Sequence, residues 1–174
     1  MITGIQNRRR AELGTEYPII EVLRDCRREI GLDNPNWEGD MRSSRARILF
    51  VEDDADTREL VRYVLTRANY EVQLAENAEE GTTLARSTSF DLYLIDNWMP
   101  GTSGMELCTK LRAYDADTPI LFLSGAAYEK DKREAIAAGA QGYLTKPANI
   151  DQLLAEVSRL ISERVNLRGL YATL

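Results

Sequence analysis

The chain has 174 residues, of which 44% are apolar and 29% are charged, a composition ordinary for one globular domain with a small appendage. A formal net charge of −6 argues against a general affinity for nucleic acid or anionic membranes, and no apolar run reaches the roughly 18 residues that a membrane span requires. The sequence contains no histidine, which excludes histidine bases and histidine-rich metal sites and leaves carboxylate, lysine and hydroxyl chemistry.

The first 45 residues differ in charge from the rest of the chain. Residues 1–47 carry 9 arginines against 8 acidic side chains, whereas residues 48–174 carry 13 basic against 20 acidic ones. No apolar stretch follows the arginines at 8–10, so they do not open a secretion signal, and we expect a cytoplasmic protein with Cys26 and Cys108 reduced. We predict an N-terminal extension over residues 1–45 with one helix at 17–31, because apolar residues recur there at helical spacing.

Five short strands are predicted after the extension. Residues 48–51, 92–95 and 120–123 are unbroken apolar runs, which are typical of strands covered on both faces. Residues 71–75 alternate between polar and apolar, and residues 142–145 form a brief run, so we expect both segments at the edges of the sheet.

Helices are predicted between these strands and after the last one. The first should span roughly residues 56–68, with Asp54 as a cap. Asn77 with Glu80, and Ser103 with Glu106, have the spacing of a capping box. The last helix should follow a cap at Asn149, with one apolar stripe formed by Ile150, Leu153, Leu154, Val157, Leu160 and Ile161. Strict alternation of strands and helices predicts an α/β fold with a parallel sheet and helices on both faces.

Polar residues follow four of the predicted strands. They are Glu52 and Asp53 after the first, Asp96 after the third, Ser124 at the end of the fourth, and Lys146 after the fifth. In a parallel sheet these positions meet at the carboxyl edge. Crowded carboxylates are relieved by a hard divalent cation, most simply Mg²⁺, and a lysine with a hydroxyl supplies what a transferred phosphoryl group requires. With no histidine present, a carboxylate is the natural nucleophile.

Several motifs resemble the receiver domain of two-component response regulators, of the CheY-like type. The matching segments are Val-Glu-Asp at 51–53, Leu-Ile-Asp-Asn-Trp-Met-Pro-Gly at 94–101, Phe-Leu-Ser-Gly at 122–125 and Gly-Tyr-Leu-Thr-Lys-Pro at 142–147. The resemblance implies a flavodoxin-like (βα)5 fold with strand order 2-1-3-4-5 over residues 46–165. It also implies a cis peptide bond between Lys146 and Pro147, and a phosphorylation-dependent switch in place of a turnover enzyme.

The resemblance also assigns a role to each residue at the predicted metal site. Asp96 would accept a phosphoryl group from a phosphohistidine, supplied by a sensor histidine kinase or a histidine phosphotransfer protein. Asp53 and Asp96 would bind Mg²⁺, Glu52 would do so through a water molecule, and Trp98 through its backbone carbonyl. The large indole of Trp98 beside the phosphorylation site suggests a further hypothesis, that it shields the acyl phosphate from water.

Three other residues would bind the phosphoryl group and transmit its presence. Lys146 would pair with the phosphate. Ser124 would move to hydrogen-bond a phosphoryl oxygen, and Tyr143 would swing inward behind it. This movement would change the surface formed by the fourth helix, the fifth strand and the fifth helix.

Two other functions remain as alternatives. A haloacid-dehalogenase-like phosphatase has the signature Asp-x-Asp-x-Thr, which residues 54–57 approximate; however, Asp54 stands three residues beyond the strand and no further acid pair follows Lys146. The second alternative is a binding module whose acidic pocket has lost its switching role.

The two ends of the chain do not decide whether the receiver stands alone or belongs to a longer protein. Residues 166–174 form a short tail without a conventional output domain, so the receiver either stands alone or is cut from a longer protein such as a hybrid histidine kinase. The helix at 17–31 could dock on the receiver, bind a partner or a second copy, or link two domains. The sequence does not identify the cognate kinase, the downstream target or the oligomeric state.

Overall fold

The computed structural model of the chain describes residues 45–125 and 127–171. The helix predicted at residues 17–31 and the charge of the N-terminal extension therefore lie outside the described residues.

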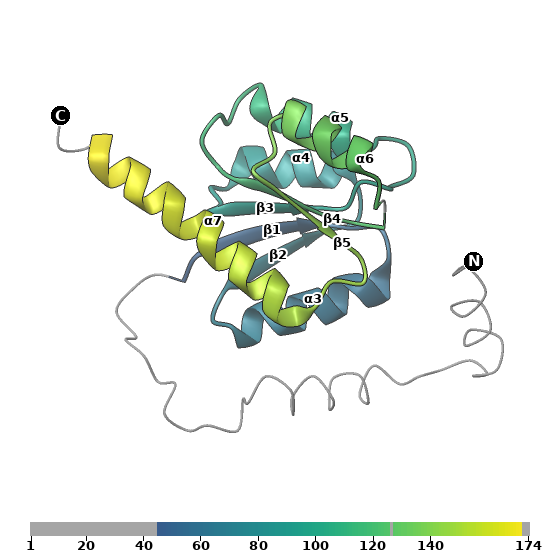
Figure 1. The fold of residues 1–174 in the computed structure, drawn as a ribbon, viewed down its shortest axis with the longest axis horizontal. Helices are drawn as coiled ribbons and strands as arrows, with labels where there is room; N and C mark the ends of the chain where they lie inside the picture. Colours follow the sequence, from purple (N-terminus) through teal and green to yellow (C-terminus); the bar gives the residue numbers. More distant parts are fainter. Residues whose placement is uncertain (1–44, 126, 172–174) are drawn as a thin grey trace. The chain divides into compact units, whose positions relative to one another are not determined.

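Five strands alternate with five helices along the described chain (Figure 1). In order, they are β1 (Arg47–Val51), α3 (Ala55–Arg67), β2 (Glu71–Ala75), α4 (Ala78–Ser87), β3 (Leu92–Ile95), α5 (Gly104–Arg112), β4 (Ile120–Ser124), α6 (Glu129–Ala137), β5 (Gly142–Thr145) and α7 (Ile150–Tyr171). The strands are all parallel and lie in the order β2-β1-β3-β4-β5. The predicted flavodoxin-like fold is confirmed, with the alternating and the brief strand at the two edges.

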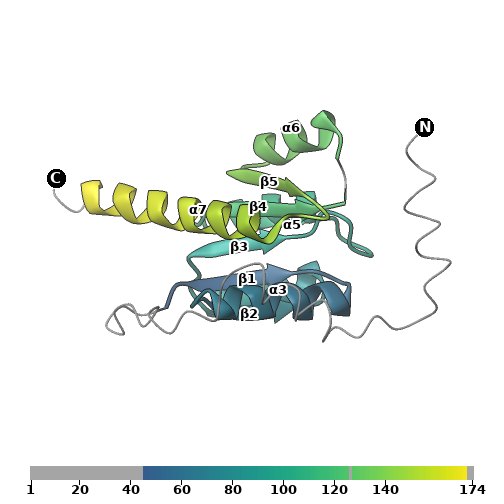
Figure 2. The same cartoon turned by 60° about the horizontal axis from the view of Figure 1, so that its bottom comes forward.

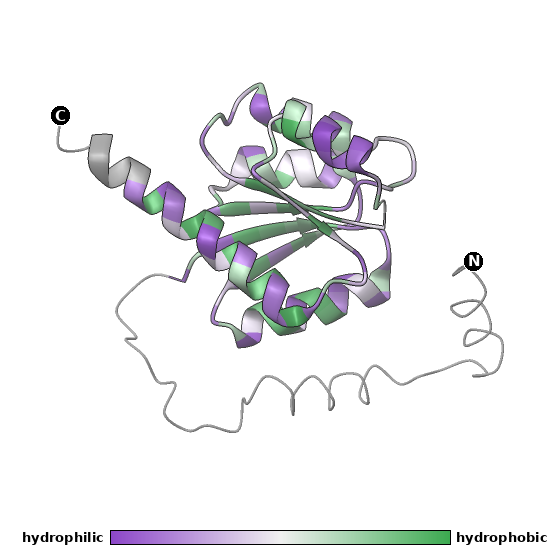
Figure 3. Cartoon of the chain, viewed as in Figure 1, coloured by the Kyte–Doolittle hydropathy of each residue, from purple (hydrophilic) through white to green (hydrophobic). Residues whose placement is uncertain are grey.

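Helices cover both faces of the sheet (Figure 2). One face packs against α3 and α7, and its core includes Phe50, Leu65 and Val157; the other packs against α4, α5 and α6, and its core includes Tyr93 and Leu107. Every residue of β3 and β4 is buried, because both faces of these strands are covered. In Figure 3, apolar residues lie along the strands and polar residues lie on the outer sides of the helices.

Side-chain caps fix the starts of four helices. Asp54 accepts a hydrogen bond from the Thr57 amide, and Ser103 forms the complete capping box with Glu106. Asn149 accepts a hydrogen bond from the Asp151 amide at the start of α7. Each of these caps lies in a loop that follows a strand at the carboxyl edge of the sheet, where the predicted site residues lie.

The capping box predicted for Asn77 and Glu80 forms only in part. Asn77 caps α4 by accepting hydrogen bonds from the amides of Glu79 and Glu80. The Glu80 carboxylate, however, accepts its hydrogen bond from the Glu76 amide at 2.8 Å instead of the Asn77 amide. The extended backbone of Asn77 brings the preceding amide within reach, a detail that residue spacing alone does not reveal.

Helix α7 continues to Tyr171, through residues that the sequence analysis assigned to a tail, and its last turns extend beyond the sheet in Figure 1. Arg164 lies where the helix leaves the domain. This side chain is buried, and its Nη1 donates a hydrogen bond to the Phe90 carbonyl at 2.7 Å. The guanidinium thus holds α7 against the loop before β3. Across residues 45–125 and 127–171, no helix combines the length and apolarity that a membrane span needs.

Candidate functional site

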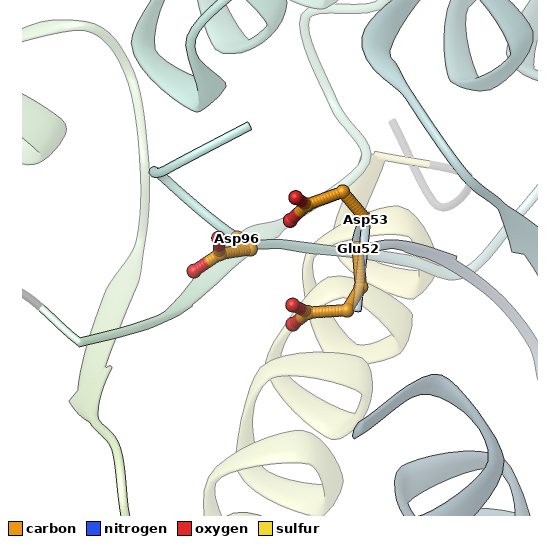
Figure 4. Close-up of side chains that lie close together, drawn as sticks. All are labelled: Glu52, Asp53 and Asp96. Carbon is orange, nitrogen blue, oxygen red and sulfur yellow. The ribbon is translucent and has the colours of Figure 1, made fainter. Parts of the chain in front are cut away.

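Three carboxylates meet at the carboxyl edge of the sheet (Figure 4). Glu52 and Asp53 follow β1, and Asp96 follows β3, the neighbouring parallel strand in which Ile95 pairs with Val51. One oxygen from each carboxylate lies within 4.8 Å of the others. Glu52 and Asp96 are buried, at 2% and 3% exposure, whereas Asp53 is exposed.

Lys146 is the cation that pairs with Glu52 and Asp96 in the described part of the chain. It follows β5 and is joined to Pro147 by a cis peptide bond, as the resemblance implied. Its Nζ lies 3.2 Å from Asp96 Oδ1 and donates a hydrogen bond to Glu52 Oε2. One ammonium group therefore pairs with two buried carboxylates, while the third carboxylate, that of Asp53, is exposed to solvent.

The Asp96 carboxylate is held at one oxygen. Its Oδ2 accepts a hydrogen bond from the Trp98 amide at 3.0 Å. Its Oδ1 is buried and, among the described residues, has no hydrogen-bond partner of good geometry, although the Lys146 ammonium is close enough for an ion pair. Oδ2 thus fixes the orientation of the group, and Oδ1 keeps lone pairs for a further ligand.

Burial raises the pKa of both inner carboxyl groups. The pKa of Glu52 and that of Asp96 lie above their ordinary values because desolvation disfavours the ionised form, and Lys146 acts in the opposite direction at each. Lys146 thus offsets only part of the free energy that burial of two ionised carboxylates costs. A hard divalent cation with oxygen ligands fits this donor set, since it would bind the carboxylates and relieve their repulsion.

Ser124 and Tyr143 lie on the adjacent strands β4 and β5. Ser124 is fully buried, and its carbonyl accepts a hydrogen bond from the Lys146 amide at 2.8 Å. The Tyr143 ring stacks on Phe122, with centroids 5.9 Å apart and planes at 16°. Burial raises the pKa of Tyr143, and a hydrogen bond with the Ser124 side chain acts in the opposite direction. The two predicted switch residues are therefore in contact.

A cavity of about 840 Å³ opens above the carboxylates. Its lining is formed by Glu52, Asp53, Asp96, Trp98, Gly125, Tyr128, Lys130, Asp131 and Lys146. Trp98 and Tyr128 at its mouth are 71% and 78% exposed. The sequence analysis missed Tyr128, Lys130 and Asp131. Tyr128 is the N-cap of α6, and Lys130 and Asp131 lie in its first turn. Their position shortly after β4 was the available signal, because the segment that follows each strand borders the carboxyl edge.

The Asp54 side chain explains the sequence pattern that favoured a phosphatase. Its Oδ1 accepts a hydrogen bond from the Thr57 amide at 2.8 Å, and hydrogen bonds from the Thr57 side chain and amide lower the pKa of Asp54. Asp54 is thus the N-cap of α3, a role that explains the Asp54–Thr57 spacing without a nucleophile.

Comparison with known proteins agrees with this geometry. The sequence profile of the response regulator receiver domain matches residues 48–158. YrkP of Bacillus subtilis, described as an uncharacterized transcriptional regulatory protein, is 42% identical over 111 residues, which are 64% of this chain and 47% of YrkP. The chain spans about half the length of the curated relatives it matches.

Two solved structures share both fold and sequence with the chain. The chemotaxis protein CheY4 of Vibrio cholerae is 34% identical, with a TM-score of 0.65, over 67% of this chain and 99% of CheY4. The response regulator protein TrrA of Thermotoga maritima, solved in complex with Mg²⁺ and BeF, is 34% identical, with a TM-score of 0.62, over 66% of this chain and 98% of TrrA. With the profile covering more than half of its residues, the chain belongs to the response regulator receiver domain family, whose members are phosphoacceptor switches of two-component signalling.

Proposed function

We propose that Asp96 is the phosphoacceptor of this receiver and takes its phosphoryl group from a histidine kinase or a histidine phosphotransfer protein in a Mg²⁺-dependent reaction. The supporting observation is the placement of Asp96 Oδ1, which lies 3.2 Å from Lys146 Nζ, beside two further carboxylates, and borders an open cavity. Glu52 and Ser124 at this edge are less suitable. Glu52 Oε2 already accepts a hydrogen bond from Lys146, whereas Asp96 Oδ1 accepts none of good geometry, and Ser124 is in contact with Tyr143.

The chemistry divides among the residues around Asp96. A carboxylate oxygen of Asp96 forms a bond to phosphorus, while the bond from phosphorus to the donor imidazole nitrogen breaks and its electron pair remains on that nitrogen. Lys146 pairs with a phosphoryl oxygen as charge develops there. Asp53 and Glu52, with the Trp98 carbonyl, would hold Mg²⁺, which when bound offsets the negative charge of carboxylates and phosphate. The Trp98 amide keeps the Asp96 carboxylate oriented through Oδ2.

The contact between Ser124 and Tyr143 suggests how the signal would leave the site. Once a phosphoryl oxygen offers a charged acceptor, the Ser124 hydroxyl hydrogen-bonds to it in place of Tyr143. The Tyr143 ring, stacked on Phe122, then changes position, which would alter the surface formed by α6, β5 and α7. The transcriptional role of YrkP is not carried over, since the match covers less than half of that protein.

Phosphorylation by a small donor tests this proposal without knowledge of the kinase. The purified chain is incubated with phosphoramidate, with Mg²⁺ or with EDTA, and its intact mass is followed over time. We expect one added phosphoryl group in wild type with Mg²⁺, none with EDTA, and none in Asp96→Asn. Equal incorporation in wild type and Asp96→Asn would disprove the assignment of Asp96.

A further inference from the structure

Arg58 holds the backbone of the loop that carries two of the three carboxylates. It lies in the first half of α3, and its Nη1 donates hydrogen bonds to the carbonyls of Glu52 at 2.7 Å and Asp53 at 2.8 Å. Its Nη2 pairs with Glu76 Oε1, at the end of β2, at 3.1 Å. The Arg58 side chain is only 11% exposed, whereas that of Glu76 is 69% exposed.

These contacts fix two consecutive peptide groups. A carbonyl held by a donor cannot rotate freely, and the orientation of successive peptide planes determines the direction in which the side chain between them leaves the backbone. The guanidinium is a rigid planar group, so the two carbonyls that it binds are held relative to each other. Arg58 therefore fixes the direction in which the Cα–Cβ bond of Asp53 leaves the backbone.

We propose that Arg58 is a positioning residue for the Mg²⁺ site, which it preorganises through the backbone of residues 52 and 53 without contacting the metal. This inference rests on the proposed function. Loss of Arg58 would leave Asp53, the exposed member of the carboxylate group, free to turn toward solvent, so that binding the cation would first require ordering the loop.

Arg58 affects Mg²⁺ binding in two opposite ways, through its charge and through its contacts with the two carbonyls. A positive charge close to a cation site repels the cation, so removal of the guanidinium charge alone would strengthen Mg²⁺ binding. Loss of the two carbonyl contacts has the opposite effect. The direction in which the Mg²⁺ dissociation constant changes therefore shows which effect is larger.

The test is a Mg²⁺ titration followed by Trp98 fluorescence, in chains that carry Trp37→Phe so that Trp98 is the only tryptophan. Trp98 is a suitable reporter because it lines the same cavity as the carboxylates. Arg58→Met should raise the Mg²⁺ dissociation constant about tenfold, the lower end of what loss of a supporting contact costs a metal site, with an unchanged plateau at saturation. Arg62→Met is the matched control, since this exposed arginine lies one turn further along α3 and pairs with Glu59.

The variants distinguish all outcomes. A dissociation constant for Arg58→Met within twofold of wild type, or lower than wild type, would overturn the proposal. If circular dichroism shows Arg58→Met to be unfolded, Arg58→Lys decides: one ammonium cannot hold both carbonyls in the same fixed geometry, so we expect an intermediate dissociation constant, and a wild-type value would refute the inference. Absence of Mg²⁺ binding in the background chain itself would instead contradict the proposed function.

Discussion

We expect Lys146 to stabilise the metal-free fold in addition to its proposed role in phosphoryl transfer. Lys146→Met measures the contribution to stability. The substitution keeps a long apolar stem and removes the one ammonium that lies between Glu52 and Asp96. Those two carboxylate side chains are 2% and 5% exposed, so each would be left as a buried charge without its ion-pair partner. The variant should therefore unfold more readily than wild type at neutral pH.

The expected loss is about 2 kcal/mol. Removing one partner of a fully buried ion pair costs about 3–5 kcal/mol. The loss is smaller here because the Lys146 side chain is 25% exposed and the site borders an open cavity, which lets water solvate the remaining charges.

The loss should depend on pH. Burial already raises the pKa of Glu52 and that of Asp96 in the folded protein, and without Lys146 only hydrogen bonds from backbone amides oppose that effect. A carboxyl group whose folded-state pKa lies above its unfolded value stabilises the fold at low pH, and this contribution is lost as the pH rises through the folded-state pKa. The difference between Lys146→Met and wild type should therefore be small near the unfolded pKa values, at about pH 4–5, and larger at pH 7.5.

Urea denaturation in EDTA at pH 5 and pH 7.5 measures both quantities. Lys132→Met, which removes a partly exposed lysine of α6 that pairs with the exposed Glu129, should unfold like wild type at both pH values. A Lys146→Met protein as stable as wild type at pH 7.5, or a deficit that does not change with pH, would show that the two carboxylates are solvated and that Lys146 does not compensate them.

Two further predictions concern the surroundings of Asp96. Trp98→Asn should lose its phosphoryl group several times faster than wild type, because the 71% exposed indole borders the cavity that water must enter; equal rates of phosphate release would end the shielding hypothesis. Gly104→Ala should destabilise the domain by about 1–3 kcal/mol and slow phosphorylation, because a Cβ at that position would lie 2.2 Å from the Asp96 carbonyl. Gly125→Ala is the control, because a Cβ at Gly125 meets open space; Gly101→Ala is unsuitable, since Gly101 has a φ of +82°. Equal urea midpoints for Gly104→Ala and Gly125→Ala would contradict the prediction.

The sheet and most of the site were predictable because they depend on local patterns. Unbroken apolar runs predicted β1, β3 and β4, and the polar residues directly after them had to meet once those strands were parallel neighbours. That reasoning correctly brought together Asp53, Asp96 and Lys146, which are separated by up to 93 positions in the sequence. The resemblance to receivers then supplied the roles of these residues, which remain proposals for this chain.

Other features could not be predicted, because they depend on contacts between elements. Arg58 is one of several arginines on a predicted helix, and only the path of the loop after β1 brings its guanidinium to two backbone carbonyls. Arg164 stands at the next position of the apolar stripe of α7; an arginine there is expected to reach solvent, yet it is buried against the Phe90 carbonyl. The hydrogen bond from the Glu76 amide to Glu80 likewise follows from the backbone conformation of Asn77 and not from residue spacing.

Chemical trapping of the phosphorylated residue tests the central proposal most directly. The chain is phosphorylated with phosphoramidate in Mg²⁺ and reduced with sodium borohydride, which converts an aspartyl phosphate to homoserine, and the modified position is located by peptide mass spectrometry. We predict homoserine at position 96 alone, and none when EDTA replaces Mg²⁺. Homoserine at position 53 or 54, or an unmodified Asp96 in a chain that has gained a phosphoryl group, would contradict the assignment of Asp96 as the phosphoacceptor.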